Sequence, residues 1–229
     1  MTTMSAPTSS VSAGILAAHF LRDPRRSFWD EQPGLAGTLT NLPQDQELYG
    51  EGDPATLFYK VVSGVVRTCK FLGDGRRQVD AFYVAGEVFG IESGDTHRLS
   101  AEAVSDCTLI AYRRRSLDSL SGRNETVARN LFQFALQNAA RAQDHALLLG
   151  HRSALEKLAT FLLHSARHSA QQATVTLEMS RQDIADFLGL TIETVSRTLS
   201  KLEKDGVIKM TASRSIHLRN LGALRALVG

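Results

Sequence analysis

The chain has 229 residues, 43% of them hydrophobic, and a formal net charge of +2. This length predicts one or two globular domains, and the near-neutral charge gives no overall signal for a polyanionic partner. The small excess of positive charge lies at the C-terminal end, because residues 168–229 hold eight Lys or Arg against six Asp or Glu. No apolar run approaches the ~18 residues that a membrane-spanning helix needs, and the uncharged start is unlike a signal peptide. We therefore expect a cytoplasmic protein with no membrane partner.

The two cysteines, Cys69 and Cys107, lie far apart in apolar runs. Their separation matches neither metal-ligand nor redox spacing. We expect both to be buried thiols in a reducing compartment.

Residues 1–25 are predicted to be a disordered or loosely ordered tail, and residues 26–122 a domain of short strands. Apolar runs alternate there with glycine turns, and Asp74-Gly75 between two of the runs is a strong hairpin signal. Strands this short and this regularly spaced favour an antiparallel barrel or roll. The predicted strands are 57–62, 65–72, 79–84 and 108–112.

Residues 123–151 are predicted to form one long helix. Six of its residues recur at alternating steps of four and three, which is typical of a coiled-coil seam. The alanines would allow two helices to approach closely, and Asn138 and His145 could fix their register. The other interpretation is a helix buried against its own roll, but the length of the stripe favours a seam between two chains. The predicted dimer seam comprises Leu131, Ala135, Asn138, Ala142, His145 and Leu149.

Residues 152–229 are predicted to be a separate helical domain, which begins with a helix at 153–167. Ser180 can cap a second helix, with Asp183 three residues on to complete a capping box. Gly189 can end that helix with a left-handed backbone. Thr191 can cap a third helix, which Gly206 ends. Two helices joined by a tight turn that contains glycine predict a helix-turn-helix.

The exposed start of the third helix carries side chains that can read DNA bases. A recognition helix meets base edges with its N-terminal residues. Arg197 can donate two hydrogen bonds to guanine, and Glu193 can accept one from cytosine. The alternative is a solvated helix face with one Glu–Arg pair, worth only ~0.2–0.5 kcal/mol. The predicted base contacts are Ile192, Glu193, Ser196 and Arg197.

A hairpin is predicted after the recognition helix, because two short apolar runs at 207–210 and 215–218 flank a polar turn at 211–214. Such a hairpin would be the wing of a winged helix-turn-helix. Arg214 would lie at its tip, either against DNA phosphate or as an ordinary solvated turn residue. Helix N-termini and exposed basic side chains commonly meet phosphate. The predicted phosphate contacts are Ser180, Arg181, Thr191, Thr194, Lys201 and Arg214.

Residues 30–225 resemble the Crp/Fnr family of bacterial transcription regulators. The residues that carry the resemblance are Glu51-Gly52-Asp53, the run 57–64, Gly86-Glu87-Val88-Phe89-Gly90 and Glu193-Thr194-Val195-Ser196-Arg197. The last of these, with the run 183–191, looks most like the FixK-type branch. The resemblance implies an α+β fold with an N-terminal antiparallel β-roll like that of cyclic-nucleotide-binding domains, a long dimerisation helix and a C-terminal winged helix-turn-helix.

The resemblance also implies a homodimeric activator that binds palindromic promoter DNA like TTGA-N6-TCAA and works with RNA polymerase. Its target genes would serve low-oxygen respiration and nitrogen fixation.

Two departures from the family pattern concern ligands. Fnr proteins carry a cysteine cluster near the N-terminus for an iron–sulfur cluster, whereas residues 1–68 contain no cysteine. Crp proteins place an Arg-Ser or Arg-Thr pair on the phosphate of a cyclic nucleotide, whereas Leu99 follows Arg98 and Asp95 lies nearby. We therefore expect no cofactor and no metal, and a structural role for Glu87. The alternative is a regulator or signalling module that responds to a small molecule in the roll.

Overall fold

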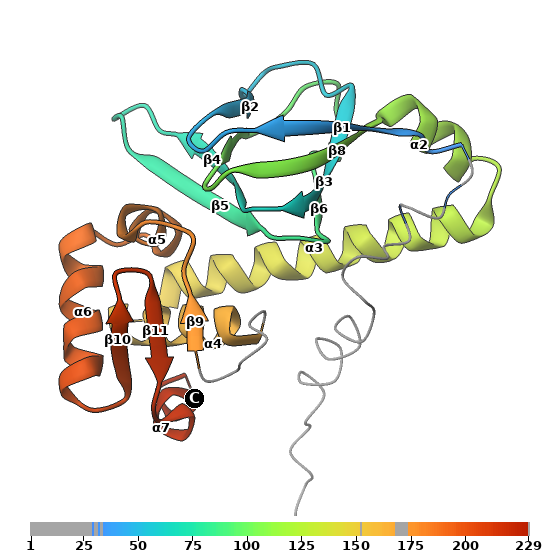
Figure 1. The fold of residues 1–229 in the computed structure, drawn as a ribbon. Helices are drawn as coiled ribbons and strands as arrows, with labels where there is room; N and C mark the ends of the chain where they lie inside the picture. Colours follow the sequence, from blue (N-terminus) through green and yellow to red (C-terminus); the bar gives the residue numbers. More distant parts are fainter. Residues whose placement is uncertain (1–28, 30–31, 33, 152, 168–173, 229) are drawn as a thin grey trace, which may run out of the picture.

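The computed structural model describes residues 29, 32, 34–151, 153–167 and 174–228. They form a β-roll and a helical domain with a small sheet, and one long helix that runs beneath the roll joins the two (Figure 1). The predicted tail at residues 1–25 lies outside the described residues.

The β-roll consists of two four-stranded antiparallel sheets. One sheet has the order β1-β8-β3-β6, with β1 at Gly37–Leu42, β8 at Cys107–Arg113, β3 at Leu57–Ser63 and β6 at Val88–Phe89. The other has the order β2-β7-β4-β5, with β2 at Glu47–Tyr49, β7 at Ser100–Ala103, β4 at Val66–Phe71 and β5 at Arg77–Tyr83. The two sheets share a core in which Val61, Val66 and Leu109 are fully buried.

The four predicted strands are confirmed as β3, β4, β5 and β8, with small shifts at their ends. Gly75 closes the β4–β5 hairpin with a φ of 82°, a value that suits glycine. The prediction missed β1, β2, β6 and β7. These strands are short or, like the edge strand β1, mostly exposed, so they carry no continuous apolar run.

Helix α2 (Arg114–Ser121) follows the roll, and the predicted long helix is confirmed as α3 (Glu125–His151). Besides the core of the roll and the core of the C-terminal domain, a third core lies where the start of α3 meets the roll. Its centre is Trp29, whose ring makes edge contacts with Phe58 of β3 and Phe134 of α3. These contacts fix the start of α3 against the roll.

The C-terminal domain contains α4 (Ala154–Arg167) and the helix-turn-helix pair α5 (Arg181–Leu188) and α6 (Ile192–Lys204). A three-stranded sheet with the order β10-β11-β9 completes it. The predicted hairpin is β10 with β11, although its turn is shorter than expected because β10 continues to Ala212. The three strands are β9 (Thr174–Thr176), β10 (Ile208–Ala212) and β11 (Ser215–Leu218), and the last helix is α7 (Leu221–Ala226).

Helix α3 turns one face to its own chain, and four of the six residues of the predicted dimer seam lie on that half-buried side. Leu131 packs on the third core, and the His145 ring stacks on Phe187 of α5 at 4.2 Å between centroids. Leu149 lies beside Gly189, and Asn138 accepts a hydrogen bond from Arg141 at 2.9 Å. These four residues are half-buried within the single chain, and the seam between two chains stays a prediction.

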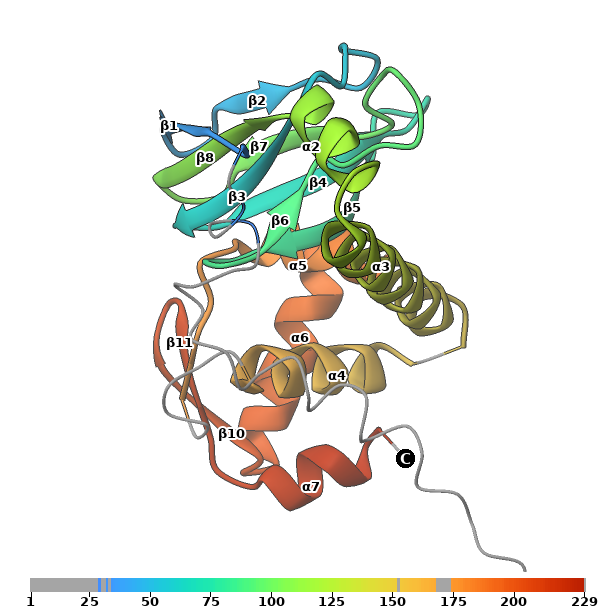
Figure 2. The same ribbon diagram turned by 90° about the vertical axis from the view of Figure 1, so that its right-hand side faces the viewer.

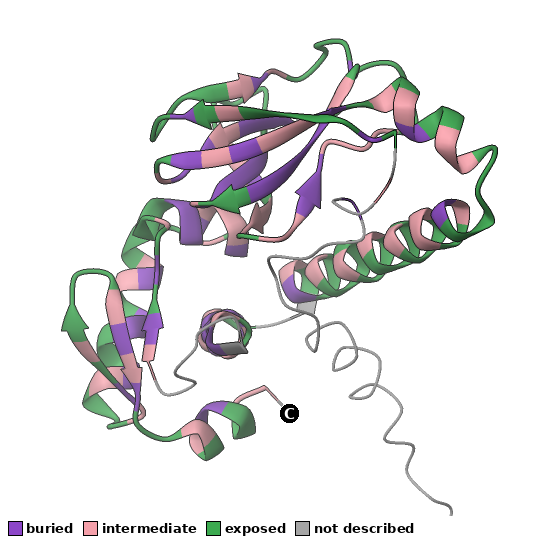
Figure 3. Ribbon diagram, turned by 45° about the vertical axis from the view of Figure 1, so that its right-hand side comes forward, coloured by how far each residue is buried: buried purple, intermediate pink, exposed green. Residues whose placement is uncertain are grey.

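A second stripe on α3 is exposed. Ala135 and Ala142 of the predicted seam lie on the exposed surface, and so do Phe132 (62%), Leu136 (50%) and Leu147 (59%). Figure 3 shows such exposed positions alternating with partly buried ones along the helix. Residues of the predicted seam therefore lie on both the half-buried and the exposed side of α3, and the exposed apolar face is available to another molecule.

Candidate nucleic-acid interface

The first helix of the motif is bounded by the predicted caps. The Ser180 hydroxyl accepts from the Asp183 amide at 3.1 Å, and the Asp183 carboxylate accepts from the Ser180 amide at 3.0 Å, which completes a capping box. At the other end, Gly189 has a φ of 60°. Both predictions are confirmed, and together they fix where the turn between α5 and α6 begins.

The second helix buries one face and exposes the other. Thr191 caps it, because its hydroxyl accepts from the Thr194 amide at 3.2 Å. Val195, Leu199 and Leu202 are buried in the domain core, which α4 helps to form by crossing α6 (Figure 2). The opposite face is therefore held in place by a packed core.

The predicted base-contact residues share the start of α6. Ile192, Glu193 and Arg197 are exposed, and Ser196 is half-buried. Arg197 Nε donates to the Glu193 carbonyl oxygen at 3.4 Å, so the two side chains lie along the same edge of the helix.

The Glu193 carboxylate is suited to accept hydrogen bonds. A hydrogen bond from its own backbone amide, helped by the Thr191 hydroxyl, holds the pKa of Glu193 below its usual range. It therefore stays ionised at neutral pH. An ionised carboxylate accepts hydrogen bonds only, as contact with a cytosine amine requires.

The predicted phosphate-contact residues surround this face. Arg181 donates to the Ser196 hydroxyl at 3.3 Å and so links α5 to α6. Lys201 and Arg214 are exposed, and Arg214 lies in the turn of the wing. The Ser180 hydroxyl is already committed, because it also donates to Asp183 at 2.7 Å. Thr191 and Thr194 bond to each other through their hydroxyls at 3.0 Å.

Three residues that the sequence did not predict help to hold the exposed face of α6 in place. Lys157 of α4 is buried, and its ammonium donates to the Leu188 carbonyl at the end of α5 at 3.1 Å. Arg67 and Arg77 reach α5 from the roll. A lysine in an amphipathic helix and arginines in strands carry no local signal for such distant partners.

The roll interior is filled by aromatic side chains. Tyr49, Tyr59 and Phe89 are buried, and the Tyr59 and Phe89 rings stack at 5.5 Å. The Tyr49 ring stacks on His97 at 3.6 Å, and burial is the main reason that the pKa of Tyr49 is raised.

The residues around this interior fit a cyclic nucleotide poorly. The Arg98 side chain is 81% exposed and pairs with Glu92 at 3.4 Å, and Leu99 follows it. Glu87 accepts from the Val84 amide at 2.9 Å and pairs with Arg141 of α3 at 3.3 Å. Glu87 therefore joins the roll to the long helix.

The described part of the chain contains no group of three or more His, Cys, Asp or Glu side chains that could hold a metal ion. It also contains no helix that is both long and apolar enough to cross a membrane.

Comparisons with known proteins agree with this architecture. A model of the cyclic nucleotide-binding domain matches residues 39–124, and a model of the Crp-like helix-turn-helix domain matches residues 156–227. The nitrogen fixation regulation protein FixK of Azorhizobium caulinodans is 49% identical over 83% of this chain and 79% of its own length. FixK of Rhizobium meliloti is 42% identical over 80% of this chain and 83% of its own length.

A solved structure is similar as well. FixK2 from Bradyrhizobium japonicum superposes with a TM-score of 0.83 at 46% identity, and the match covers 85% of this chain and 98% of that one. The chain belongs to the Crp/Fnr family of transcription regulators. Within that family it is a FixK-like DNA-binding regulator and not an enzyme. The predicted fold class is confirmed.

DNA binding by this chain is expected to resist hydrogen peroxide. Cys69 and Cys107 are both buried, and burial raises the pKa of the Cys69 thiol to about 12 and also raises that of Cys107. Because the thiolate is the form that peroxide oxidises, both thiols should be inert. Mobility-shift assays before and after peroxide treatment measure this.

The Ser180→Cys variant is the matched positive control for peroxide. Position 180 is exposed at the N-terminus of α5 beside Arg181, and we expect these two features to lower the pKa of a thiol there against the opposing charge of the Asp183 carboxylate. Its oxidation would set negative charge against the DNA backbone, so this variant should lose binding. Equal sensitivity of both proteins would contradict the prediction and place a reactive thiol at Cys69 or Cys107.

Proposed function

We propose that this chain is a homodimeric transcription activator that reads a palindrome like TTGA-N6-TCAA. Its target promoters would serve low-oxygen respiration and nitrogen fixation, and it would act there with RNA polymerase. The FixK proteins with which it shares 49% and 42% identity are named as regulators of nitrogen fixation, which supports this assignment.

The observation that carries the proposal is the exposed start of α6. Arg197 and Glu193 lie there with Ile192, above a buried stripe that fixes the helix. A guanidinium that can take the O6 and N7 of guanine and a carboxylate that can take the N4 of cytosine suit the G·C pair of a TTGA half-site. Ile192 is suited to a thymine methyl group.

The proposal of a palindromic site is supported by a surface that suits a two-fold dimer. The exposed apolar face of α3, with Phe132, Leu136 and Leu147, is the surface that we assign to the two-fold contact. A two-fold axis along paired α3 helices would relate two α6 helices. Each would meet one half-site, with one helical turn of DNA between the half-site centres.

We expect the purified protein to select such a palindrome from a random DNA pool without nucleotide or metal. We expect no need for a nucleotide because the interior of the roll already holds the rings of Tyr49, Tyr59 and Phe89. The measurement is a selection of bound sequences in buffer with a chelator, with cyclic AMP added to a parallel sample. Recovery of unrelated sequences would overturn the proposed target, and a strict need for cyclic AMP would favour a regulator switched by a ligand.

A further inference from the structure

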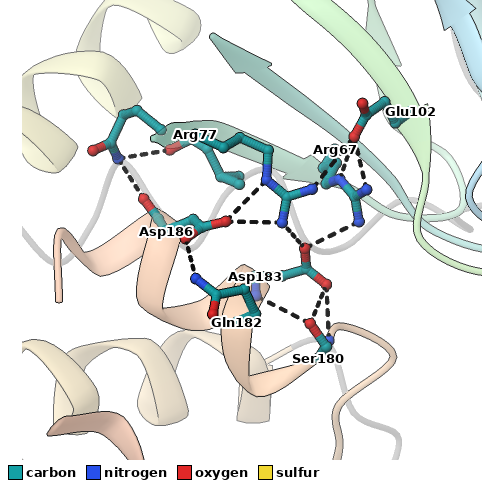
Figure 4. Close-up of polar contacts among 9 residues, drawn as sticks. Arg67, Arg77, Glu102, Ser180, Gln182, Asp183 and Asp186 are labelled. Atoms are coloured by element: carbon teal, nitrogen blue, oxygen red, sulfur yellow. Dashed lines mark hydrogen bonds and ion pairs between the residues drawn. The ribbon is translucent and has the colours of Figure 1, made fainter. Parts of the chain in front are cut away.

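The roll holds the first helix of the DNA-binding motif through an ion-pair network. Arg67 Nη1 lies 3.0 Å and Arg77 Nη2 2.5 Å from the same oxygen of Asp183. Arg77 also pairs with Asp186, one turn further along α5, at 2.8 Å. Glu102 of β7 accepts from Arg67 at 2.7 Å on the other side. Figure 4 shows the two guanidinium groups between the strands and the helix.

The network is shielded from water. The exposed fraction of the side chain is 9% for Arg67, 18% for Arg77, 5% for Asp183 and 12% for Asp186. Exposed ion pairs contribute little, whereas breaking a buried pair leaves an uncompensated charge. A guanidinium group also has fixed, planar donors, so its pairing with two carboxylates constrains direction as well as distance.

Asp183 connects this network to the DNA-binding motif. Its carboxylate accepts from the Ser180 amide and hydroxyl and so caps α5, while its other oxygen accepts from Arg67 and Arg77. The network therefore holds the capped N-terminus of α5, the helix that precedes the turn into α6.

The other end of α5 is held from outside the domain as well. Gln78 of β5 donates to the Asp186 carbonyl at 2.7 Å. His145 of α3 stacks on Phe187 and lies 2.8 Å from its carbonyl oxygen. Helix α5 is thus attached at both ends to the roll and to the long helix.

We infer that Arg67 and Arg77 are positioning residues for DNA recognition. Through Asp183 and Asp186 they fix the orientation of α5, and with it α6, relative to the roll and α3. In the dimer this sets the distance between the two recognition helices, so that only half-sites at the correct separation are bound by both. The inference rests on the proposed function, since it requires a dimer on palindromic DNA.

The test measures how strictly the protein requires the half-site separation. Wild type and Arg77→Gln are titrated against the selected palindrome and against versions with one or two base pairs added to or removed from its centre. Wild type should bind the original far more tightly than the altered versions. For Arg77→Gln, the ratio of the affinity for the original palindrome to the affinity for the altered versions should fall by about tenfold or more. The reason is that a loosely attached α5 can adjust to a changed half-site separation.

This ratio separates positioning from stability. A variant that is partly unfolded loses apparent affinity for every operator by the same factor, so its ratio does not change. The matched control is Arg76→Gln, since the neighbouring Arg76 side chain is 77% exposed and pairs with Asp74 in its own hairpin. It should keep the wild-type ratio.

A double-mutant cycle separates the positioning role of Arg77 from a folding defect of Arg77→Gln. Asp186→Asn should lower the ratio in the same direction, and the double variant should add little to Arg77→Gln, because the partners act as one unit. An unchanged ratio in both single variants would overturn the inference. Wild type that binds no palindrome, or binds all spacings equally, would overturn it too, and the former result would also refute the proposed function.

Discussion

Replacing Leu136 with glutamate should convert the protein into a monomer and reduce its operator affinity by about 100-fold or more, since linked half-site binding commonly gains a factor of 10² to 10⁴. Leu136 is 50% exposed in the single chain and lies on the exposed apolar face of α3. At a two-fold contact the substitution places two like charges close together in an apolar seam, which is strongly unfavourable. Sedimentation equilibrium at micromolar concentration measures the assembly, and mobility shift measures the affinity.

Gln137→Glu is the matched control for the dimer. It introduces the same charge at the next position of the helix, which is exposed and turned by about 100° from Leu136. This variant should remain a dimer with wild-type affinity. A Leu136→Glu protein that sediments as a dimer and binds normally would place the two-fold contact elsewhere on the molecule.

The exposed apolar face of α3 could not be predicted from the sequence alone. The spacing of four and three correctly predicted a long helix with an apolar stripe, but apolar residues of α3 lie on two sides of the helix. Leu131 and His145 belong to the one that packs on the same chain, whereas Leu136 belongs to the exposed one. Periodicity reports which residues share a face, and only the tertiary structure shows what that face contacts.

Local signals predicted the helix-turn-helix well. A capping box at Ser180, a left-handed Gly189 and a cap at Thr191 act over three or four residues, so their consequences are visible in the sequence. The network around Asp183 is different. Arg67 and Arg77 are 116 and 106 residues away from it, and within their strands nothing distinguishes them from solvated arginines. Such long-range pairs follow only from how the two domains meet.

Arg197→Ala is expected to weaken binding to the preferred operator by about 1–3 kcal/mol and to relax discrimination at one guanine of each half-site. Arg197 is exposed on the face of α6 opposite the buried Val195 and Leu199. Its loss removes a bidentate contact with a base edge while the core that holds α6 stays intact. The informative quantity is the affinity ratio between the preferred operator and one in which that guanine is replaced by adenine.

Arg214→Ala provides the comparison for base reading. Arg214 is exposed in the turn of the wing, where we expect a contact with phosphate. Phosphate carries no sequence information, so this variant should weaken both operators alike and reduce the salt dependence of binding. The two variants thus separate affinity from specificity. If Arg197→Ala also left the ratio unchanged, Arg197 would be a phosphate contact, and base reading would depend on Glu193 and its neighbours.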